Sequence, residues 1–340
     1  IWLLMDRGIV GQRVAIYASD TKIVSRVLQM LEIERLPHLR IIGYADDRNR
    51  TEKNPVNDIK YLGGFDALLN LAQAGQLDQV ILALPDIQQS RLDFIADSLS
   101  SASIDLCLLP RETMEISSRY KVNFLGSLPV LAIWQQPIRD VDGLLKEFID
   151  RFSALVALVV LGPMLLFVAI AIRVESKGPI IFRQKRFGFN NNEISVLKFR
   201  SMYVDKQDTT GAARTQKNDP RVTWVGKFIR RTSIDELPQL INVLRGDMSL
   251  VGPRPHATQM RVGDKFYFDA VKGYSARHRV KPGITGLAQV RGLRGEIATI
   301  ERARKRVEYD TYYIENWSPL FDIRIILETF AKLIWDKHAY

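Results

Sequence analysis

A long uncharged segment, residues 152–172, constrains this chain more than any other feature. It reads FSALVALVVLGPMLLFVAIAI, and Arg151 and Arg173 bracket it. About twenty consecutive apolar residues are enough to cross the hydrocarbon core of a bilayer as a straight helix. A core helix of a soluble domain needs only one apolar stripe, whereas this segment is apolar on every face. The sequence therefore predicts a helix that contacts a membrane.

The dipeptide Gly162-Pro163 lies at the centre of that segment. Proline removes a helical hydrogen bond and clashes with the preceding turn, so we expect a kink there. A kinked helix with a basic residue at each end can span the bilayer, or it can enter, bend and leave on the same side. Composition does not choose between the two forms, although charge on both flanks favours the re-entrant one. The lysines and arginines downstream place that end on the cytoplasmic face.

The net charge of +10 is concentrated in the second half of the chain. Residues 1–172 carry 17 Lys and Arg against 20 Asp and Glu, about −3, whereas residues 173–340 carry 31 against 18, about +13. The second half therefore requires an anionic partner. Nucleic acid, anionic lipid headgroups and a nucleotide-bearing substrate all satisfy this requirement on charge alone. The single cysteine, Cys107, excludes an internal disulfide framework.

Apolar runs alternate with helical stretches before the membrane segment. We expect strands at residues 13–18, 39–45, 79–84 and 104–109, with helices at 21–33, 66–74 and 88–101. This alternation predicts an α/β, Rossmann-like domain with a mostly parallel sheet. The turn after the first strand reads YASDT and lacks the glycines of a G-x-G-x-x-G dinucleotide site. We therefore expect a degenerate nucleotide-binding fold, used for sensing or dimerisation.

The chain, at 340 residues, is too long for one ordinary domain. We expect the α/β fold class throughout, with a parallel-sheet domain, a kinked re-entrant membrane helix and a mixed α/β monotopic catalytic domain. The expected divisions are a remnant of an upstream membrane region at 1–10, the Rossmann-like domain at 11–134, a linker and interfacial helix at 135–150, the membrane helix at 151–173 and the catalytic domain at 174–340.

Two adjacent acids, Asp235 and Glu236, precede an apolar helical pattern in the basic half. Apolar residues recur at i, i+3, i+4 and i+7 over residues 237–244, and Gly246 follows as a stop signal. We therefore expect a helix to begin close to the two acids. A helix N-terminus carries unpaired amide donors and the positive end of the macrodipole, so it stabilises carboxylates and attracts phosphate.

A purely structural interpretation of the same residues is available. Ser233 and Glu236 spell the S-x-x-E capping box that opens many ordinary helices. If Ser233 were the cap, Pro238 would lie beyond the first turn, where its missing N–H removes a helical hydrogen bond. If the helix starts nearer Asp235, Pro238 lies in the first turn and removes no helical hydrogen bond, and the acids are less needed as helix caps.

Basic residues flank the acids along the sequence. Lys198 and Arg200 alternate with apolar residues and are expected to share one face of a strand. Arg230 precedes the acids, and Arg254 follows between two prolines that fix the backbone around it. Stiff placement of an arginine is what bidentate phosphate recognition requires. A second basic, glycine-punctuated loop at residues 277–286 could line the same cleft.

Taken together, these segments resemble the bacterial polyprenyl-phosphate hexose-1-phosphate transferases, which are monotopic phosphoglycosyl transferases that initiate exopolysaccharide, capsule or O-antigen units. The match runs over residues 148–340, and the first half resembles the nucleotide-binding-fold domain of the larger members. The segments that carry the resemblance are residues 176–184, 198–202, 218–221, 232–240, 246–255 and 279–286.

The resemblance implies a reaction between a UDP-hexose, expected to be UDP-glucose, and undecaprenyl phosphate, with Mg²⁺ required and UMP released. By position, Asp235 is the nucleophile that forms a phosphosugar-aspartyl intermediate, and Glu236 is its partner. Both acids are implied to help hold the metal. Lys198, Arg230 and Arg254 match basic positions of the family's site, and Arg200 is expected to join them in binding phosphate.

The family also implies a place for the chain in the cell. We expect the re-entrant helix in the bacterial inner membrane, the catalytic domain on the cytoplasmic face, a homodimer, and no nucleic-acid partner. Other members often carry serine where this chain has Gly162, which leaves the exact bend open. The alternative from another class is a membrane-tethered regulatory protein that senses a nucleotide or binds lipid without catalysis.

Overall fold

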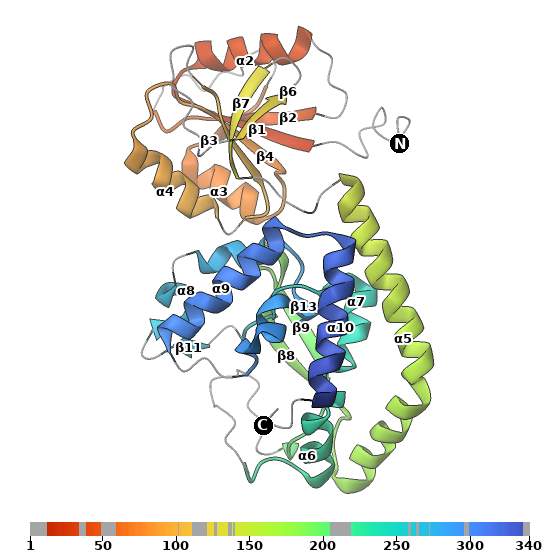
Figure 1. Ribbon diagram of the computed structural model, residues 1–340. Helices are drawn as coiled ribbons and strands as arrows, with labels where there is room; N and C mark the ends of the chain where they lie inside the picture. Colours follow the sequence, from red (N-terminus) through yellow and green to blue (C-terminus); the bar gives the residue numbers. More distant parts are fainter. Residues whose placement is uncertain are drawn as a thin grey trace. The chain divides into compact units, whose positions relative to one another are not determined.

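The computed structural model describes residues 12–33, 39–48, 59–100, 102–110, 121–125, 128–134, 138, 140–204, 219–257, 260–262, 265–271, 273–295 and 299–335. The chain divides into two compact units, Ile1–Gln136 and Pro137–Tyr340 (Figure 1). The expected membrane remnant at residues 1–10, and Asn218 of the family-like segments, lie outside the described residues.

The first unit contains a seven-stranded sheet with the order β3-β2-β1-β4-β5-β7-β6. Its first five strands are parallel, and β7 runs antiparallel to both β5 and β6. The predicted α/β fold with a mostly parallel sheet is therefore confirmed. The strands are β1 Gln12–Ala18, β2 Leu39–Ala45, β3 Tyr61–Gly63, β4 Gln79–Ala83, β5 Asp105–Leu108, β6 Lys121–Leu125 and β7 Leu128–Trp134.

Helices cover both faces of this sheet. One apolar cluster joins the sheet to α3 and α4, and a second joins it to α2. Because both faces are buried, the central strands read as continuous apolar runs rather than alternating ones. That is why their positions could be read from the sequence. The helices are α2 Thr21–Ile33, α3 Phe65–Gln73 and α4 Gln89–Leu99.

Asp47 follows β2 at the carboxyl end of the parallel strands, where nucleotide folds bind their ligands. Its carboxylate accepts hydrogen bonds from Tyr17 Oη at 2.5 Å, Arg91 Nη2 at 2.7 Å and the Phe65 main-chain N–H at 2.7 Å. Burial, and then the hydrogen bond to Asp47, raise the pKa of Tyr17 to about 12. The acid is thus engaged by the unit's own side chains, consistent with the expected degenerate fold.

The uncharged segment lies within one helix, α5 Asp140–Glu175, which opens the second unit. Gly162 and Pro163 lie inside it, and the ribbon follows a curved course (Figure 1). Residues 140–150 belong to the same helix, so no break separates the expected interfacial segment from the expected membrane segment. Over Asp142–Glu175 the helix is long and apolar enough to cross a membrane, and only 11% of its apolar window is buried in the protein.

The rest of the second unit is a set of short strands and helices packed along α5. The hairpin β8–β9 is antiparallel, and β10 pairs with β13 in parallel. Ala154 of α5 packs with Val196 of β9 and Leu240 of α7 in one apolar cluster. The elements are β8 Ile181–Phe187, β9 Glu193–Phe199, α6 Trp224–Arg231, α7 Gln239–Arg245, β10 Ser249–Val251, β11 Arg261–Val262, β12 Lys265–Phe266, α8 Tyr267–Ala270, β13 Gly283–Thr285, α9 Ile300–Glu315 and α10 Pro319–Trp335.

Candidate active site

The two adjacent acids lie on a single 3₁₀ turn, Ile234–Glu236, between α6 and α7. The sequence predicted a helix start close to the acids, and the α-helix itself begins at Gln239, after Pro238, one turn beyond them. The reason is local: Ser233 adopts a left-handed conformation with φ of 60°, which reverses the chain before the turn. Proline then lies just ahead of α7, where its missing N–H costs no helical hydrogen bond.

The capping-box interpretation does not hold. Ser233 makes no side-chain cap, and its Oγ instead accepts a hydrogen bond from Arg294 Nη2 at 2.6 Å. Glu236 directs its carboxylate toward basic residues rather than back to the Ser233 main chain. The sequence pattern was therefore present without the structure it usually indicates.

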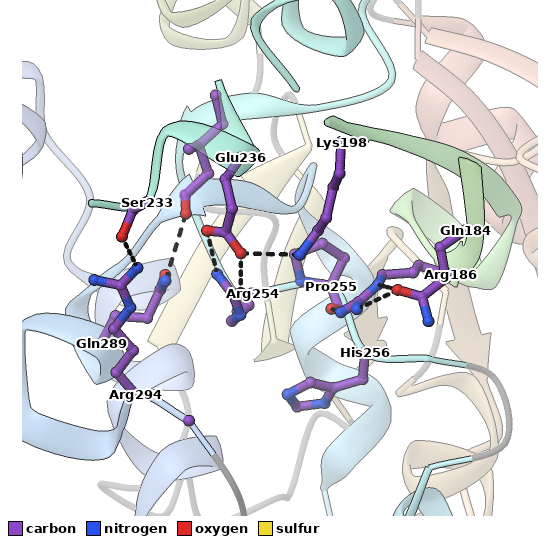
Figure 2. Close-up of polar contacts among 12 residues, drawn as sticks. Gln184, Arg186, Lys198, Ser233, Glu236, Arg254, Pro255, His256, Gln289 and Arg294 are labelled. Carbon is purple, nitrogen blue, oxygen red and sulfur yellow. Dashed lines mark hydrogen bonds and ion pairs between the residues drawn. The ribbon is translucent and has the colours of Figure 1, made fainter. Parts of the chain in front are cut away.

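Glu236 is buried, and two cations neutralise it. Lys198 Nζ donates to Oε1 at 2.9 Å, Arg254 Nη1 donates to Oε2 at 3.1 Å, and Arg254 Nη2 donates to Oε1 (Figure 2). Burial alone would disfavour the charged form. The charges of Arg254 and Lys198 outweigh it and hold the pKa of Glu236 well below its usual range. Glu236 is thus a fixed anion that orients two basic side chains.

Asp235 differs sharply from its neighbour, although it is similarly buried at 9% exposure. Among the residues that the structure describes, no hydrogen bond or ion pair involves its carboxylate. Burial, followed by the negative charge of Glu236, raises its pKa to about 6, against opposing effects of Lys198 and Arg230. A carboxylate that is poorly stabilised and unpartnered is chemically available.

The main chain around Arg254 is held rigidly. Gly252 lies so close to the β13 strand that a Cβ would meet Lys281 O at 2.6 Å, and a Cβ at Gly283 would meet Gly252 N at 2.1 Å. Only glycine permits this approach. From the other side, Arg277 Nη2 donates to the Arg254 carbonyl at 2.9 Å. Gly283 and Arg277 of the 277–286 loop thus support the main chain around Arg254, whereas the sequence predicted that this loop could line the cleft.

A buried polar layer lies behind this loop. Arg277 pairs with Asp310 at 2.7 Å and contacts His256 Nδ1 at 2.7 Å, and Arg306 Nη1 lies 3.2 Å from His256 Nε2. Burial and the charges of Arg277 and Arg306 hold the pKa of His256 well below its usual range, so this histidine is neutral. His256 therefore separates two guanidinium groups, and no sequence pattern pointed to it.

Arg200 is not where the sequence placed it. It follows β9 instead of sharing a strand face with Lys198, and it is only 1% exposed. Its guanidinium donates to the carbonyls of Lys177 at 2.9 Å, Ser176 at 2.7 Å and Ile172 at 3.2 Å. These carbonyls close the C-terminal end of α5, where a cation is favourable. Arg200 thus stabilises the end of the helix. The structure does not support the prediction that it binds phosphate.

The remaining predicted residues fall in two places. Arg230 lies in the last turn of α6, and its charge acts on Asp235. Gly162 and Pro163 lie in α5, distant in sequence from the acids. The structure adds Arg186 of β8 to the candidate site. The charge of Arg254 acts on Arg186, and Arg186 donates to the Pro255 carbonyl at 2.5 Å (Figure 2). The alternation of Gln184 and Arg186 opposite Lys198 was the signal that could have identified it.

The acids offer a limited ligand set for a divalent cation. Within the described residues, no group of three or more His, Cys, Asp or Glu side chains is arranged to hold a metal. Mg²⁺ usually binds through one or two carboxylates together with substrate phosphates, so two acids fit this mode. Both oxygens of Glu236 are already paired with cations, which makes Asp235 the better protein ligand of the two.

Comparisons with known proteins agree with this architecture. A model of the bacterial sugar transferase family matches residues 141–336, and a model described as a CoA-binding domain matches residues 3–110. An undecaprenyl-phosphate glucose phosphotransferase of Komagataeibacter xylinus is 38% identical over 97% of this chain and 60% of its own length. A UDP-glucose:undecaprenyl-phosphate glucose-1-phosphate transferase of Escherichia coli (strain K12) is 41% identical over 82% of this chain and 60% of its own length.

A third relative matches a shorter stretch of this chain. The exopolysaccharide production protein PSS of Rhizobium leguminosarum bv. phaseoli is 52% identical over 56% of this chain and 94% of its own length. The chain spans 60% of the length of the two longer relatives, whereas it covers nearly all of this one. The matched family segment includes both acids, Lys198 and Arg254, and makes up more than half of the chain. The chain therefore belongs to the bacterial sugar transferase family.

Proposed function

We propose that this protein transfers hexose 1-phosphate from a UDP-hexose, with glucose as the expected hexose, to undecaprenyl phosphate. The observation that carries the proposal is the unequal pair of acids. Glu236 is neutralised by Lys198 and Arg254, whereas the neighbouring Asp235 is buried, unpartnered among the described residues and reluctant to ionise. The names of the relatives support the substrates, since two of them are named for glucose phosphate transfer to this lipid.

The first step forms a covalent intermediate. A carboxylate oxygen of Asp235 attacks the sugar-proximal phosphorus of the donor, and the bond from that phosphorus to the bridging oxygen breaks. UMP leaves with the bonding electron pair, and the hexose phosphate remains esterified to Asp235. Arg254, fixed by its prolines and by Arg277, neutralises charge that develops on the phosphoryl oxygens.

The second step regenerates the acid. A phosphate oxygen of the polyprenyl phosphate attacks the same phosphorus, and the bond to Asp235 breaks. The product is the polyprenyl diphosphate hexose, and Asp235 is again a free carboxylate. Splitting the transfer in this way lets one fixed set of cations serve both substitutions.

We also propose Mg²⁺ as the cofactor, held by Asp235 and phosphate oxygens of the donor. When bound, it would neutralise diphosphate charge in the manner common to phosphoryl-transfer enzymes. Glu236 would have to release Lys198 or Arg254 to bind the ion directly.

The exposed apolar surface of α5 supports a place in the bacterial inner membrane, with the basic second unit on the cytoplasmic face. Val159, Val160 and Phe167 are each at least 70% exposed. Exposure of these apolar side chains is unfavourable in water but not in lipid. Such an anchor holds the acids near the headgroup of a lipid substrate. The re-entrant course, the kink at Pro163 and the homodimer remain predictions.

The test is to incubate the full chain in lipid nanodiscs with UDP-glucose, undecaprenyl phosphate and Mg²⁺. We expect UMP and the lipid-linked sugar in equal amounts. A panel of UDP-sugars offered in parallel identifies the preferred hexose. Failure to form lipid-linked product from any UDP-sugar, by a protein that remains folded, would contradict the proposal.

A further inference from the structure

Arg186 projects from the same face of the β8–β9 hairpin as Lys198. The register pairs Phe182 with Lys198, and Arg186 with Ile194. Paired residues of an antiparallel ladder point the same way, as do alternate residues along one strand. Gln184, Arg186 and Lys198 therefore share the face that meets Glu236, whereas Arg183 occupies the opposite face and is exposed.

The guanidinium of Arg186 is held firmly but incompletely used. Gln184 Oε1 accepts from Nε at 3.1 Å and from Nη2 at 2.6 Å, and the Pro255 carbonyl accepts from Nη1 at 2.5 Å. A guanidinium carries five N–H groups, so three are satisfied within the described chain. The two that remain are one on Nη1 and one on Nη2. Donors on both terminal nitrogens of a guanidinium can bind two oxygens of a phosphate group.

No carboxylate of the described residues pairs with Arg186, although it lies beside another cation. Glu236 is shared by Lys198 and Arg254, and Arg277 is paired with Asp310. Burial, and then the charge of Arg254, lower the pKa of Arg186 to about 10, so it remains protonated at neutral pH. Arg186 thus adds a positive charge beside Arg254 and has no ion-pair partner among the described residues, which is unfavourable until an anion arrives.

We propose that Arg186 is a further substrate-binding residue, whose two open Nη hydrogens bind phosphate oxygens of the nucleotide-sugar diphosphate beside Arg254. The inference rests on the proposed function, because it assumes a diphosphate-bearing donor. It distinguishes Arg186 from Arg200, whose Nη nitrogens are directed at main-chain carbonyls.

The experiment measures the equilibrium affinity for UDP by titration calorimetry on the full chain in nanodiscs. The variants are Arg186→Gln, Arg186→Lys and, as the matched control from the opposite face of β8, Arg183→Gln. Thermal unfolding of each variant is followed in parallel. Losing a charged hydrogen-bonding pair should weaken UDP binding by about tenfold or more in Arg186→Gln. Arg186→Lys should show a smaller loss, and Arg183→Gln should match the wild type.

An affinity of folded Arg186→Gln within about twofold of the wild type would overturn the inference. If Arg186→Gln does not fold, the affinity of Arg186→Lys for UDP is the test, because lysine keeps the positive charge but lacks the paired N–H donors of the guanidinium. Unchanged affinity there overturns the inference, and a loss supports it. If the wild type transfers sugar phosphate and Arg186→Lys binds UDP with wild-type affinity, only this inference is refuted. A wild-type protein that neither binds UDP nor transfers sugar phosphate refutes the proposed function instead.

Discussion

Each unit of this protein contains a cluster of acidic residues and their partners. In the first unit Asp47 lies beside Tyr17 and Arg91, and in the second unit Asp235 and Glu236 lie beside Lys198 and Arg254. In the first unit, Asp47 is about half exposed, with a side-chain exposure of 44%, and all its donors come from its own fold. In the second unit, Asp235 and Glu236 are buried, and the charges of Lys198, Arg230 and Arg254 act on them. Similar residue types thus produce one cluster whose acid is fully hydrogen-bonded and one in which, among the described residues, Glu236 is paired and Asp235 is not.

The difference lies in how charge and burial are combined. Asp47 accepts three hydrogen bonds, one of them from Arg91, so a ligand would have to displace existing contacts. The second-unit cluster has Arg186 without a carboxylate and Asp235 without a hydrogen bond, among the described residues. A buried site with unused hydrogen-bond donors binds an anionic substrate favourably, because the phosphate oxygens of the substrate accept those hydrogen bonds.

The largest contrast should appear in activity. Asp235→Asn removes the proposed nucleophile and is expected to reduce sugar-phosphate transfer by about 10³-fold or more. Asp47→Asn changes a cluster that the proposed mechanism does not use, so transfer should remain within about twofold of the wild type. Both rates are measured as UMP release under saturating donor. Comparable losses in the two variants would remove the functional distinction between the clusters.

Two arginines of the second unit should separate stability from activity. Arg200→Gln breaks several hydrogen bonds at the end of α5 and should lower the free energy of unfolding by about 3 kcal/mol. Its KM for the donor should be unchanged at a temperature where it is folded. Denaturant unfolding and steady-state kinetics test this. A stable Arg200→Gln variant with weakened donor binding would restore the original prediction that Arg200 binds phosphate.

The two aspartates should also differ in the sign of their effect on stability. The pKa of Asp235 rises from 3.8 to about 6 on folding, so the folded state binds more protons in that interval. Stability is therefore lost as the pH rises from about 4 to about 6, and the full penalty persists above. Asp235→Asn should raise the free energy of unfolding at pH 7.5 by about 2 kcal/mol.

Asp47→Asn should instead lower the free energy of unfolding by about 1 kcal/mol, because it weakens hydrogen bonds that the fold has already made. Denaturant titrations at pH 7.5 and pH 4 measure both variants. If Asp235→Asn destabilised the protein, Asp235 would be a structural acid.

The smallest expected effect is a shift of the pH profile. Asp235 must be ionised to attack, so single-turnover UMP release should fall as the pH decreases through about 6. The charge of Glu236 contributes to this raised pKa, so Glu236→Gln should move the acid limb to lower pH. Stopped-time assays across the pH range measure the limb. An acid limb that stays in place in Glu236→Gln would show that the two acids are not coupled.

The sequence predicted those parts of the molecule in which a local pattern is enough. Continuous apolar runs located β1, β2, β4 and β5, because both faces of that sheet are covered. The strands β6 and β7 were missed, since they add an antiparallel edge that does not follow the βαβ alternation. The long apolar helix was also found, although its extension to Asp140 was not.

The candidate site was predictable in its members but not in its contacts. Asp235, Glu236, Lys198 and Arg254 were identified from their patterns, and the structure brings the last three together. Arg200 was misplaced because strand alternation fails where β9 ends at Phe199. Arg186 was missed because the alternation along β8 was not matched to Lys198 on the facing strand. His256 was missed because its importance depends on what folds against it, which no short motif records.

Trapping the covalent intermediate tests the central claim most directly. The full chain is incubated with UDP-glucose and Mg²⁺ in the absence of lipid acceptor, then digested and analysed by mass spectrometry. The account predicts one hexose-phosphate group on the peptide that contains Asp235, absent from Asp235→Asn and discharged by undecaprenyl phosphate. Formation of lipid-linked product without any adduct on Asp235, under conditions where the intermediate should accumulate, would contradict the account.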